Sequence, residues 1–204
     1  MKPDFEKAQN AATELLLGQN IDSLYIDARN FKLPSNIIID SIQNFSQLTH
    51  YPLSLLNTDK IDGALVLSQG NKKIILYDDD ISNEQRKHWG IIHELGHIYL
   101  GHIYLGHIYL GHTDDCKNSE IEAHFFAAQL VSPEIVLWDI CRRKGQLTDT
   151  DIFTHFNLSY EASTKRIQTL SRRLRYNSAA SDKELLNKFV PILDRVFSSG
   201  QKVS

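Results

Sequence analysis

The sequence predicts an α+β fold, with a small antiparallel sheet, a long helix carrying the motif HELGH, and a small helical region at the carboxyl end. Three observations support this prediction. Two short apolar runs flank a turn, HELGH stands about three turns into a helical pattern, and helix-start signals recur along the second half of the chain. With 204 residues, of which 42% are hydrophobic, the chain can bury a core as one compact domain, alone or with a small appendage.

The first half is expected to hold two helices and a hairpin. Residues 4–17 place apolar side chains on one face and end before a glycine, which is typical of a helix. A second helical pattern covers residues 35–48. The apolar runs 64–67 and 74–77 flank Gln69-Gly70-Asn71, a turn signal that predicts an antiparallel hairpin.

Helix-start signals mark the second half. Ser82-Asn83-Glu84-Gln85 has the spacing of a capping box, so a helix should begin near Asn83 and run through HELGH. Ser119-Glu120-Ile121-Glu122 repeats the signature and should open another helix. Further helices are expected from Ser132-Pro133 to Gly145, over 151–156 and 160–176 around Asn157-Leu158-Ser159, and from Ser181 onward.

HELGH has the spacing of half a zinc site. Residues four apart on a helix lie nearly above one another, so His93 and His97 can direct imidazole nitrogens at one ion, at roughly 2.1 Å. Glu94 lies about 100° around the helix from His93, where it can act as general base on a water at the metal. The chemistry that this arrangement favours is hydrolysis of a peptide bond. The structural alternative is a surface helix with two solvated histidines.

A hydrolytic zinc site needs a third protein ligand, and Glu120 can supply it. Its helix face includes the small residues Ala123 and Ala127, which allow a neighbouring helix to approach closely. Glu122 is the rival ligand. We favour Glu120 because Glu122, as the third residue of the expected capping box, would reach back to Ser119.

HELGHIYLGH and the downstream EIEAHFFAAQLVSP together resemble the ImmA/IrrE family of metallopeptidases. The resemblance implies a zincin-type fold and a zinc-dependent endopeptidase that cleaves or inactivates a regulator protein, such as a phage or mobile-element repressor. It also implies one Zn²⁺ ion held by His93, His97 and Glu120, with Glu94 as the catalytic base.

The resemblance covers residues 63–133 with specific motifs. We therefore expect a zincin-like metallopeptidase domain over 1–133 and a helical carboxyl-terminal region over 134–204. His124 departs from the family pattern, which usually has Asn or Asp at this position. It leaves four alternatives open: support of a metal ligand, donation to an oxyanion, competition for the metal, or no role. Tyr99 and His102 are further oxyanion candidates.

HIYLG occurs three times in tandem, from residues 97, 102 and 107. Five residues advance a helix by about 140° beyond a full turn, so the copies would point in different directions and do not form a polyhistidine cage. We interpret the repeat as a ten-residue expansion of HELGHIYLGHTDD. Each glycine costs about 1 kcal/mol relative to Ala inside a helix, which favours looping the extra residues out. Impaired activity and metal binding by the extra histidines both stay open.

Composition narrows the class of protein. The net charge of -3 gives no general attraction to nucleic acid or anionic lipid. The two cysteines form no CxxC motif, the amino terminus lacks the apolar core of a signal peptide, and the uncharged stretch 95–113 contains glycines and four histidines. We therefore expect a cytoplasmic protein without membrane contact.

The carboxyl-terminal region is locally basic, with a surplus of five positive charges over 142–175. Residues 151–167 have a helix-turn-helix-like pattern, but we favour a solvated basic face on packed helices, and no direct nucleic-acid contact is expected. The expected partner is a protein substrate, a helix-turn-helix repressor. A catalytically impaired module that disables a repressor by contact and a DNA-binding regulator are the alternative functions. The oligomeric state stays open.

Overall fold

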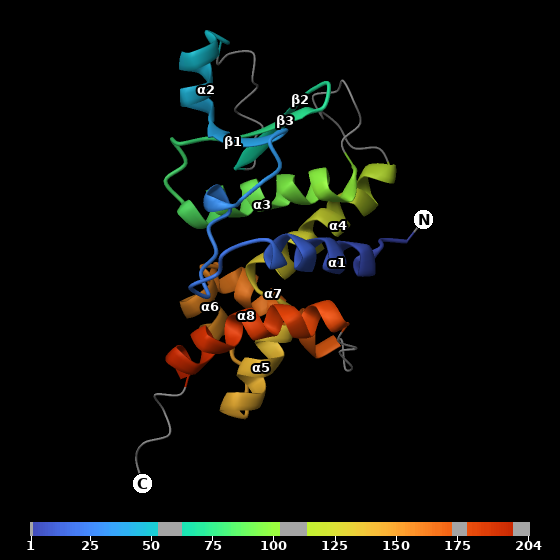
Figure 1. Ribbon diagram of the computed structural model, residues 1–204, viewed down its shortest axis with the longest axis vertical. Helices are drawn as coiled ribbons and strands as arrows, with labels where there is room; N and C mark the ends of the chain where they lie inside the picture. Colours follow the sequence, from blue (N-terminus) through green and yellow to red (C-terminus); the bar gives the residue numbers. More distant parts are fainter. Residues whose placement is uncertain (1, 53–62, 103–113, 173–178, 198–204) are drawn as a thin grey trace. The chain divides into compact units, whose positions relative to one another are not determined.

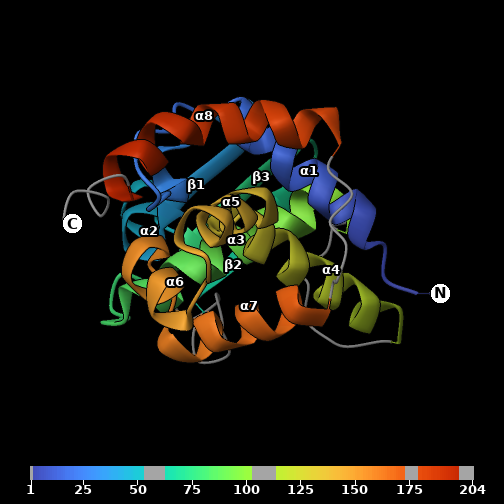
Figure 2. The ribbon, with the colours of Figure 1, turned by 90° about the horizontal axis from the view of Figure 1, so that it is seen from below.

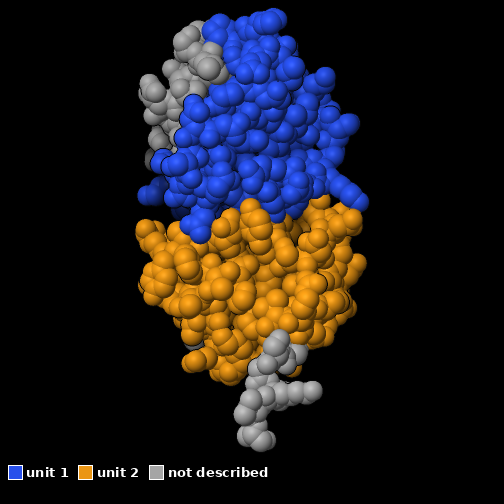
Figure 3. All heavy atoms as spheres, turned by 90° about the vertical axis from the view of Figure 1, so that its left-hand side faces the viewer, with its two compact units in different colours: residues 1–11, 27–127 blue, residues 12–26, 128–204 orange. Residues whose placement is uncertain are grey.

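The computed structural model describes residues 2–52, 63–102, 114–172 and 179–197, and all of their side chains except those of 114–116. The chain divides into two compact units, which Figure 3 colours blue and orange. Unit 1 comprises residues 1–11 and 27–127, and unit 2 comprises residues 12–26 and 128–204. HELGH belongs to unit 1. The expected domain boundary after residue 133 stays a prediction.

In the described part of unit 1, three strands form one sheet (Figure 1). They are β1 (Ile37–Ser41), β2 (Ala64–Gln69) and β3 (Lys72–Tyr77), in the spatial order β1-β3-β2. β2 and β3 pair antiparallel around Gly70, whose φ of 57° fits the tight turn between them. The predicted hairpin is therefore confirmed, and the mixture of helices and sheet is that of an α+β fold.

The sheet is mixed, so the prediction of a small antiparallel sheet is correct for the pair β2–β3 but not for β1. β1 pairs with β3 in parallel, which places Ile39 beside Ile75. The prediction of a helix over 35–48 is wrong for its first half, since only Ile42–Thr49 form a helix, α2. The run of isoleucines before it favours a strand because β-branched side chains pack well on a pleated surface. The Ser41 side chain then accepts a backbone hydrogen bond and starts α2.

Different helices cover the two faces of the sheet (Figure 1). On one face, Ile42 of α2 and Leu76 of β3 form a buried cluster. The partly buried residues packed against this cluster are Phe45, Tyr51, Leu65, Leu67 and Ile74. Val66 and Ile75 alternate with these residues, so they point to the other face, where α3 (Glu84–Leu100) packs against β2 and β3. The helix carrying HELGH is thus seated on the sheet.

Both ends of α3 are defined by local interactions. The helix begins after Asn83, whose side chain accepts a hydrogen bond from the backbone N–H of Arg86. The cap is therefore Asn83, one residue later than the predicted Ser82. The helix ends at Leu100, because Gly101 adopts a left-handed φ of 75° and its N–H bonds to carbonyl groups of the last turn. The predicted helix through HELGH is confirmed.

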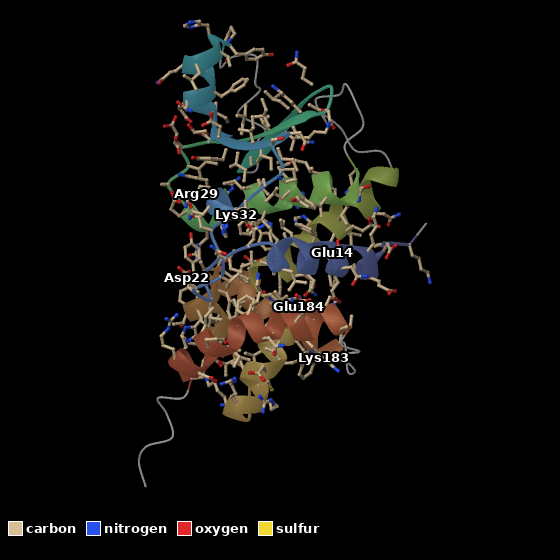
Figure 4. All side chains as sticks on the ribbon, in the orientation of Figure 1. Glu14, Asp22, Arg29, Lys32, Lys183 and Glu184 are labelled. Carbon is tan, nitrogen blue, oxygen red and sulfur yellow. The ribbon has the colours of Figure 1, made fainter. Side chains whose placement is uncertain are left out.

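A short 3-10 helix, η1 (Ala28–Asn30), lies against the first turns of α3. The Ala28 backbone N–H donates to Nε2 of the buried His88 at 3.2 Å. Arg29, labelled in Figure 4, also lies 3.4 Å from the carboxylate of Glu84. These contacts anchor the amino end of α3, and they give His88 a structural role.

Parts of two more helices belong to unit 1, namely the start of α1 (Phe5–Leu17) and most of α4 (Asp114–Val131). The predicted helix over 4–17 is confirmed. Lys7 of α1 donates from Nζ to the carbonyl of Leu100 at 2.7 Å. This ammonium group satisfies a carbonyl that the helix itself leaves free, and its charge complements the carboxyl end of α3.

The regular secondary structure in the described residues of unit 2 is helical. Besides the ends of α1 and α4, it contains α5 (Glu134–Lys144), α6 (Asp149–Phe156), α7 (Tyr160–Arg172) and α8 (Ala180–Phe197). Figure 2 shows α7 and α8 on opposite sides of α5. Within this unit, Lys188 of α8 donates to the carbonyl of Gln19 at 2.7 Å, just after α1. Glu14 on α1 and Glu184 on α8 mark these two helices in Figure 4.

Basic side chains of unit 2 are engaged within the unit. The guanidinium of Arg166 is almost fully buried, donates to the Ser132 carbonyl at 2.7 Å, and lies 3.7 Å from the buried carboxylate of Glu134. Asp139 pairs with two arginines, Asp151 with Lys144, and Glu161 with Lys165. Several cations of this basic region are therefore paired with carboxylates of the same unit.

The uncharged stretch 95–113 is divided by the end of α3. Its first six residues, 95–100, complete α3, and Leu95 and Leu100 are buried. Residues 103–113 lie outside the described residues. In the parts of the chain that the structure describes, every helix is too short or too polar to cross a lipid bilayer.

Candidate metal centre

Two histidines of HELGH lie on the same side of α3. His93 and His97 are one helical turn apart, and their Nε2 atoms are separated by 3.1 Å. Their rings meet edge to face, with centroids 4.8 Å apart. Both side chains are largely withdrawn from solvent, with 14% exposed for His93 and 7% for His97. Two imidazole nitrogens therefore converge on one shielded point.

The carboxylate of Glu120, on α4, completes the cluster. Its Oε2 lies 3.1 Å from Nε2 of His93, and its Oε1 lies 3.3 Å from Nε2 of His97. These hydrogen bonds hold the pKa of Glu120 well below its usual range, and they outweigh the effect of burial. The group is therefore a carboxylate anion at neutral pH, as a metal ligand must be.

Close approach of α3 and α4 brings this carboxylate within reach. A Cβ atom built at Gly96 would lie 3.1 Å from the backbone oxygen of Ala123 and 3.1 Å from the ring of Phe126. Ala123 and Ala127 are fully buried, in agreement with the prediction of small residues on the contact face of α4. The sequence reasoning missed Gly96, the glycine inside HELGH.

The three donor groups fit a zinc ion. Ligands bound to zinc at about 2.1 Å in a tetrahedron stand roughly 3.4 Å apart. The three Nε2 and carboxylate contacts measure 3.1, 3.1 and 3.3 Å. Among the described residues, this is the group whose ligand atoms all lie within 4.8 Å of one another. Two imidazoles and one carboxylate are also the ligand set of a known class of catalytic zinc site.

Glu94 follows His93 on α3 and is partly buried beside the cluster. Burial raises the pKa of Glu94 above its usual value, against the opposing influence of His97 and His93, and the charge of Glu120 raises it further. A carboxylate with a raised pKa is a better proton acceptor, which suits a general base. Glu94 is not one of the three clustered donors.

A second histidine–carboxylate pair lies behind His97. Nδ1 of His102 is 3.2 Å from Nδ1 of His97, and Nε2 of His102 is 3.0 Å from Oε2 of Glu122. The other oxygen of Glu122 accepts the backbone N–H of Asp4 at 2.8 Å. Burial lowers the pKa of His102, although the hydrogen bond to Glu122 opposes this shift, so the imidazole is neutral at pH 7. A continuous polar chain therefore runs from His97 to Glu122.

The position of Glu122 corrects the reasoning about the third ligand. α4 begins at Asp114, so Ser119 lies inside the helix and the predicted capping box is wrong. Glu122 is not part of the metal cluster; its carboxylate bonds to His102 and to the backbone N–H of Asp4. The preference for Glu120 agrees with the geometry, but the reason given for it does not. The sequence signal that could have indicated the His102–Glu122 pair is the dipeptide Gly101-His102, in which a histidine directly follows the glycine that ends α3.

The other oxyanion candidates have different surroundings. Tyr99 stacks on Phe126 with ring centroids 6.1 Å apart, and burial raises the pKa of its hydroxyl. The exposed His124 has its ring centroid 4.3 Å from that of His93 and 6.1 Å from that of Trp89. His124 therefore stands beside a candidate ligand, between that ligand and an aromatic side chain.

Comparison with known proteins gives one finding. The profile of the IrrE N-terminal-like domain, peptidase family M78, matches residues 53–168, which is more than half of the chain. The match includes every residue of the metal cluster and the His102–Glu122 pair. Searches of curated proteins and of solved structures gave no significant match.

Proposed function

The chain belongs to the peptidase M78 family, and on that premise we propose that it is a zinc-dependent endopeptidase. The proposed metal ligands are His93, His97 and Glu120, and the proposed catalytic base is Glu94. The observation that carries the proposal is the convergence of three donor groups within a largely buried cluster: the two Nε2 atoms lie 3.1 Å apart, and each lies 3.1 to 3.3 Å from one oxygen of the Glu120 carboxylate. Helix α3 supplies two of these donors and α4 the third, so the cluster depends on two neighbouring helices.

Each protein group has a distinct part in the proposed reaction. Zinc bound by the cluster would supply a Lewis acid that polarises the scissile carbonyl. Glu94 accepts a proton from the attacking water and can then deliver it to the leaving amine. Glu120 stays ionised, which balances part of the metal charge. Burial of the two imidazoles limits the access of bulk water, which would compete with them for the metal.

We propose a DNA-binding repressor, of a phage or mobile element, as the substrate that is cleaved or inactivated in the cytoplasm. The family resemblance of HELGH and the downstream helix supports a protein substrate. The net charge of -3 gives no electrostatic reason for the chain to seek nucleic acid itself. Arg143, Lys144 and Arg166 of unit 2 are paired with carboxylates of the same unit. This pairing also argues against direct binding of nucleic acid, because these cations already stabilise the fold.

The substitution Glu94→Gln tests the proposal. It removes the base but keeps the shape and leaves the three ligands in place. Untagged wild-type protein and the variant should both contain about one zinc per chain by elemental analysis. Cleavage of a quenched fluorescent peptide library should fall at least roughly 100-fold in the variant. Glu14→Gln, on an exposed part of α1, is the matched control and should cleave like wild type.

Two results would overturn the proposal. One is a zinc content no higher than that of a chain carrying both His93→Ala and His97→Ala. The other is cleavage that Glu94→Gln leaves unchanged, since no reaction through this base would then exist. If zinc binds and neither wild type nor variant cleaves any peptide or candidate repressor, the contact-only alternative is favoured.

A further inference from the structure

We propose that His102 and Glu122 are positioning residues that fix the protonation of His97, so that Nε2 of His97 is free to bind the metal. This inference rests on the proposed function, because it concerns the same cluster. His102 contacts His97 on one side and Glu122 on the other, and neither residue is among the three clustered donors.

The hydrogen atoms in this chain can be assigned from the three contacts. A neutral imidazole carries one N–H, and a metal-binding Nε2 must be without it. The hydrogen of His97 is then on Nδ1, which donates to Nδ1 of His102 across 3.2 Å. His102 must therefore carry its own hydrogen on Nε2, which donates to the Glu122 carboxylate across 3.0 Å. The reverse assignment would leave the carboxylate facing a bare nitrogen and would put a hydrogen on Nε2 of His97.

The backbone places His102 for this role. Gly101 adopts its left-handed conformation at the end of α3, and the N–H of His102 then donates to the carbonyl of His97 at 2.9 Å. Backbone and side chain of His102 thus both bond to the same residue. This arrangement follows from the spacing Gly101-His102 after the helix, and it needs the first copy of the repeat and only the first residue of the second copy.

Glu122 is held by a bond that leaves one oxygen for His102. Its Oε1 accepts the Asp4 N–H at 2.8 Å, while its Oε2 faces His102. The side chains of His102 and Glu122 are only 10% and 13% exposed, so water competes poorly for the bond between them. A fixed carboxylate that accepts a hydrogen from an imidazole orients that ring and selects its tautomer.

The two candidate histidine ligands differ in the hydrogen bonding of their Nδ1 atoms. Nδ1 of His93 is buried and has no hydrogen-bond partner among the described residues. Nδ1 of His97, in contrast, begins the chain to Glu122. Among the described residues, a hydrogen bond at Nδ1 therefore selects the tautomer of His97 but not that of His93.

Zinc affinity measured by competition with a chromophoric chelator tests the positioning role. His102→Leu removes both hydrogen bonds and should weaken zinc binding by roughly 10- to 100-fold. His102→Gln should restore most of the affinity, because its amide oxygen can accept from His97 and its amide nitrogen can donate to Glu122. His155→Leu, in unit 2, controls for the loss of one imidazole and should bind zinc like wild type. Circular dichroism checks that each variant is folded.

The outcomes separate this inference from the proposed function. If wild type binds no more zinc than the chain with both His93→Ala and His97→Ala, the proposed function fails. If wild type binds zinc tightly and a folded His102→Leu variant binds it equally well, only the positioning role fails. Long-range nitrogen–proton correlation spectra of the zinc-loaded wild type give a second readout. They should find the His102 hydrogen on Nε2, and a hydrogen on Nδ1 would overturn the assignment even if His102→Leu does not fold.

Discussion

At the scale of single residues, Glu120 and Glu122 show how position decides the role of a carboxylate. They are two residues apart on α4, and successive residues on a helix are rotated by about 100°, so their side chains leave the helix in different directions. Glu120 meets the two imidazoles of HELGH, while Glu122 meets His102 and a backbone N–H. The first is suited to bind a metal and the second to orient a neighbouring ring.

The substitution Glu120→Gln should reduce zinc affinity by more than the roughly 10- to 100-fold that the loss of an outer hydrogen-bond partner costs. The amide lacks the charge that balances the metal, and its neutral oxygen is a poorer ligand. The same chelator competition measures the effect, with Glu14→Gln as control. Equal affinities of wild type and Glu120→Gln would exclude Glu120 as a ligand.

A second residue-scale prediction concerns acid stability through Asp139. Burial raises its pKa, but hydrogen bonds from Arg142 and Arg143 lower it more, so the folded pKa lies below the unfolded value of about 3.9. The resulting stability is present above that unfolded value and is lost as the pH falls through the folded pKa. Asp139→Asn should lower the free energy of unfolding at neutral pH by about 1–3 kcal/mol.

Urea titrations of wild type and Asp139→Asn at neutral pH and at about pH 3 check this prediction. The difference between the two proteins should shrink at the acid pH, because the carboxylate of the unfolded wild type takes up a proton below about 3.9 while the folded state resists protonation. A difference that stays constant with pH would show that packing, and not the charge of Asp139, stabilises this part of α5.

At the scale of elements, α3 is held between the sheet and α4 by glycines. A Cβ atom at Gly90 would lie 2.8 Å from the backbone of Gly63 and of Ala64, and one at Gly96 would press on α4. The sheet sets the place of α3, and α4 approaches it closely on the side of Gly96. The distance over which Glu120 must reach is therefore determined by backbone contacts, not by the ligands.

Gly90→Ala should destabilise unit 1 by about 1–3 kcal/mol, because the added methyl group overlaps backbone that cannot move aside. This cost exceeds the gain of about 1 kcal/mol in helix propensity from Gly to Ala. Urea unfolding measures it. Gly18→Ala is the matched control, since its Cβ would lie 3.5 Å from the nearest atom, an ordinary contact. An equal or higher stability of Gly90→Ala would contradict the tight seating of α3.

At the scale of the whole molecule, the tandem repeat separates the helices that supply the donors. α3 ends at Leu100 and α4 begins at Asp114, so the repeat does not lengthen the helix that carries HELGH. The first copy supplies His97 and Gly101, and His102 is the first residue of the second copy. Residues 103–113, which include His107 and His112, lie outside the described residues, and the hypothesis of a ten-residue expansion stays a prediction.

Deletion of residues 103–112, which leaves HELGHIYLGHTDD, should retain zinc at the wild-type stoichiometry. The physical reason is that all three donors and the His102–Glu122 pair are outside the deleted segment. Elemental analysis and chelator competition on both chains provide the measurement. Zinc bound only by the shortened chain would mean that the expansion disrupts the site, and a loss of zinc on deletion would mean that the extra copies contribute to it.

The sequence alone determined the helix through HELGH, the β2–β3 hairpin and the residues expected to act on a metal, because these depend on spacing along one element or on short turns. Only the tertiary structure decided the parallel pairing of β1, the start of α4, and the separation of Glu122 from the cluster. It also decided that His102 contacts His97. These features depend on long-range packing, such as the approach of α4 to Gly96 and of Asp4 to Glu122, which no local pattern encodes.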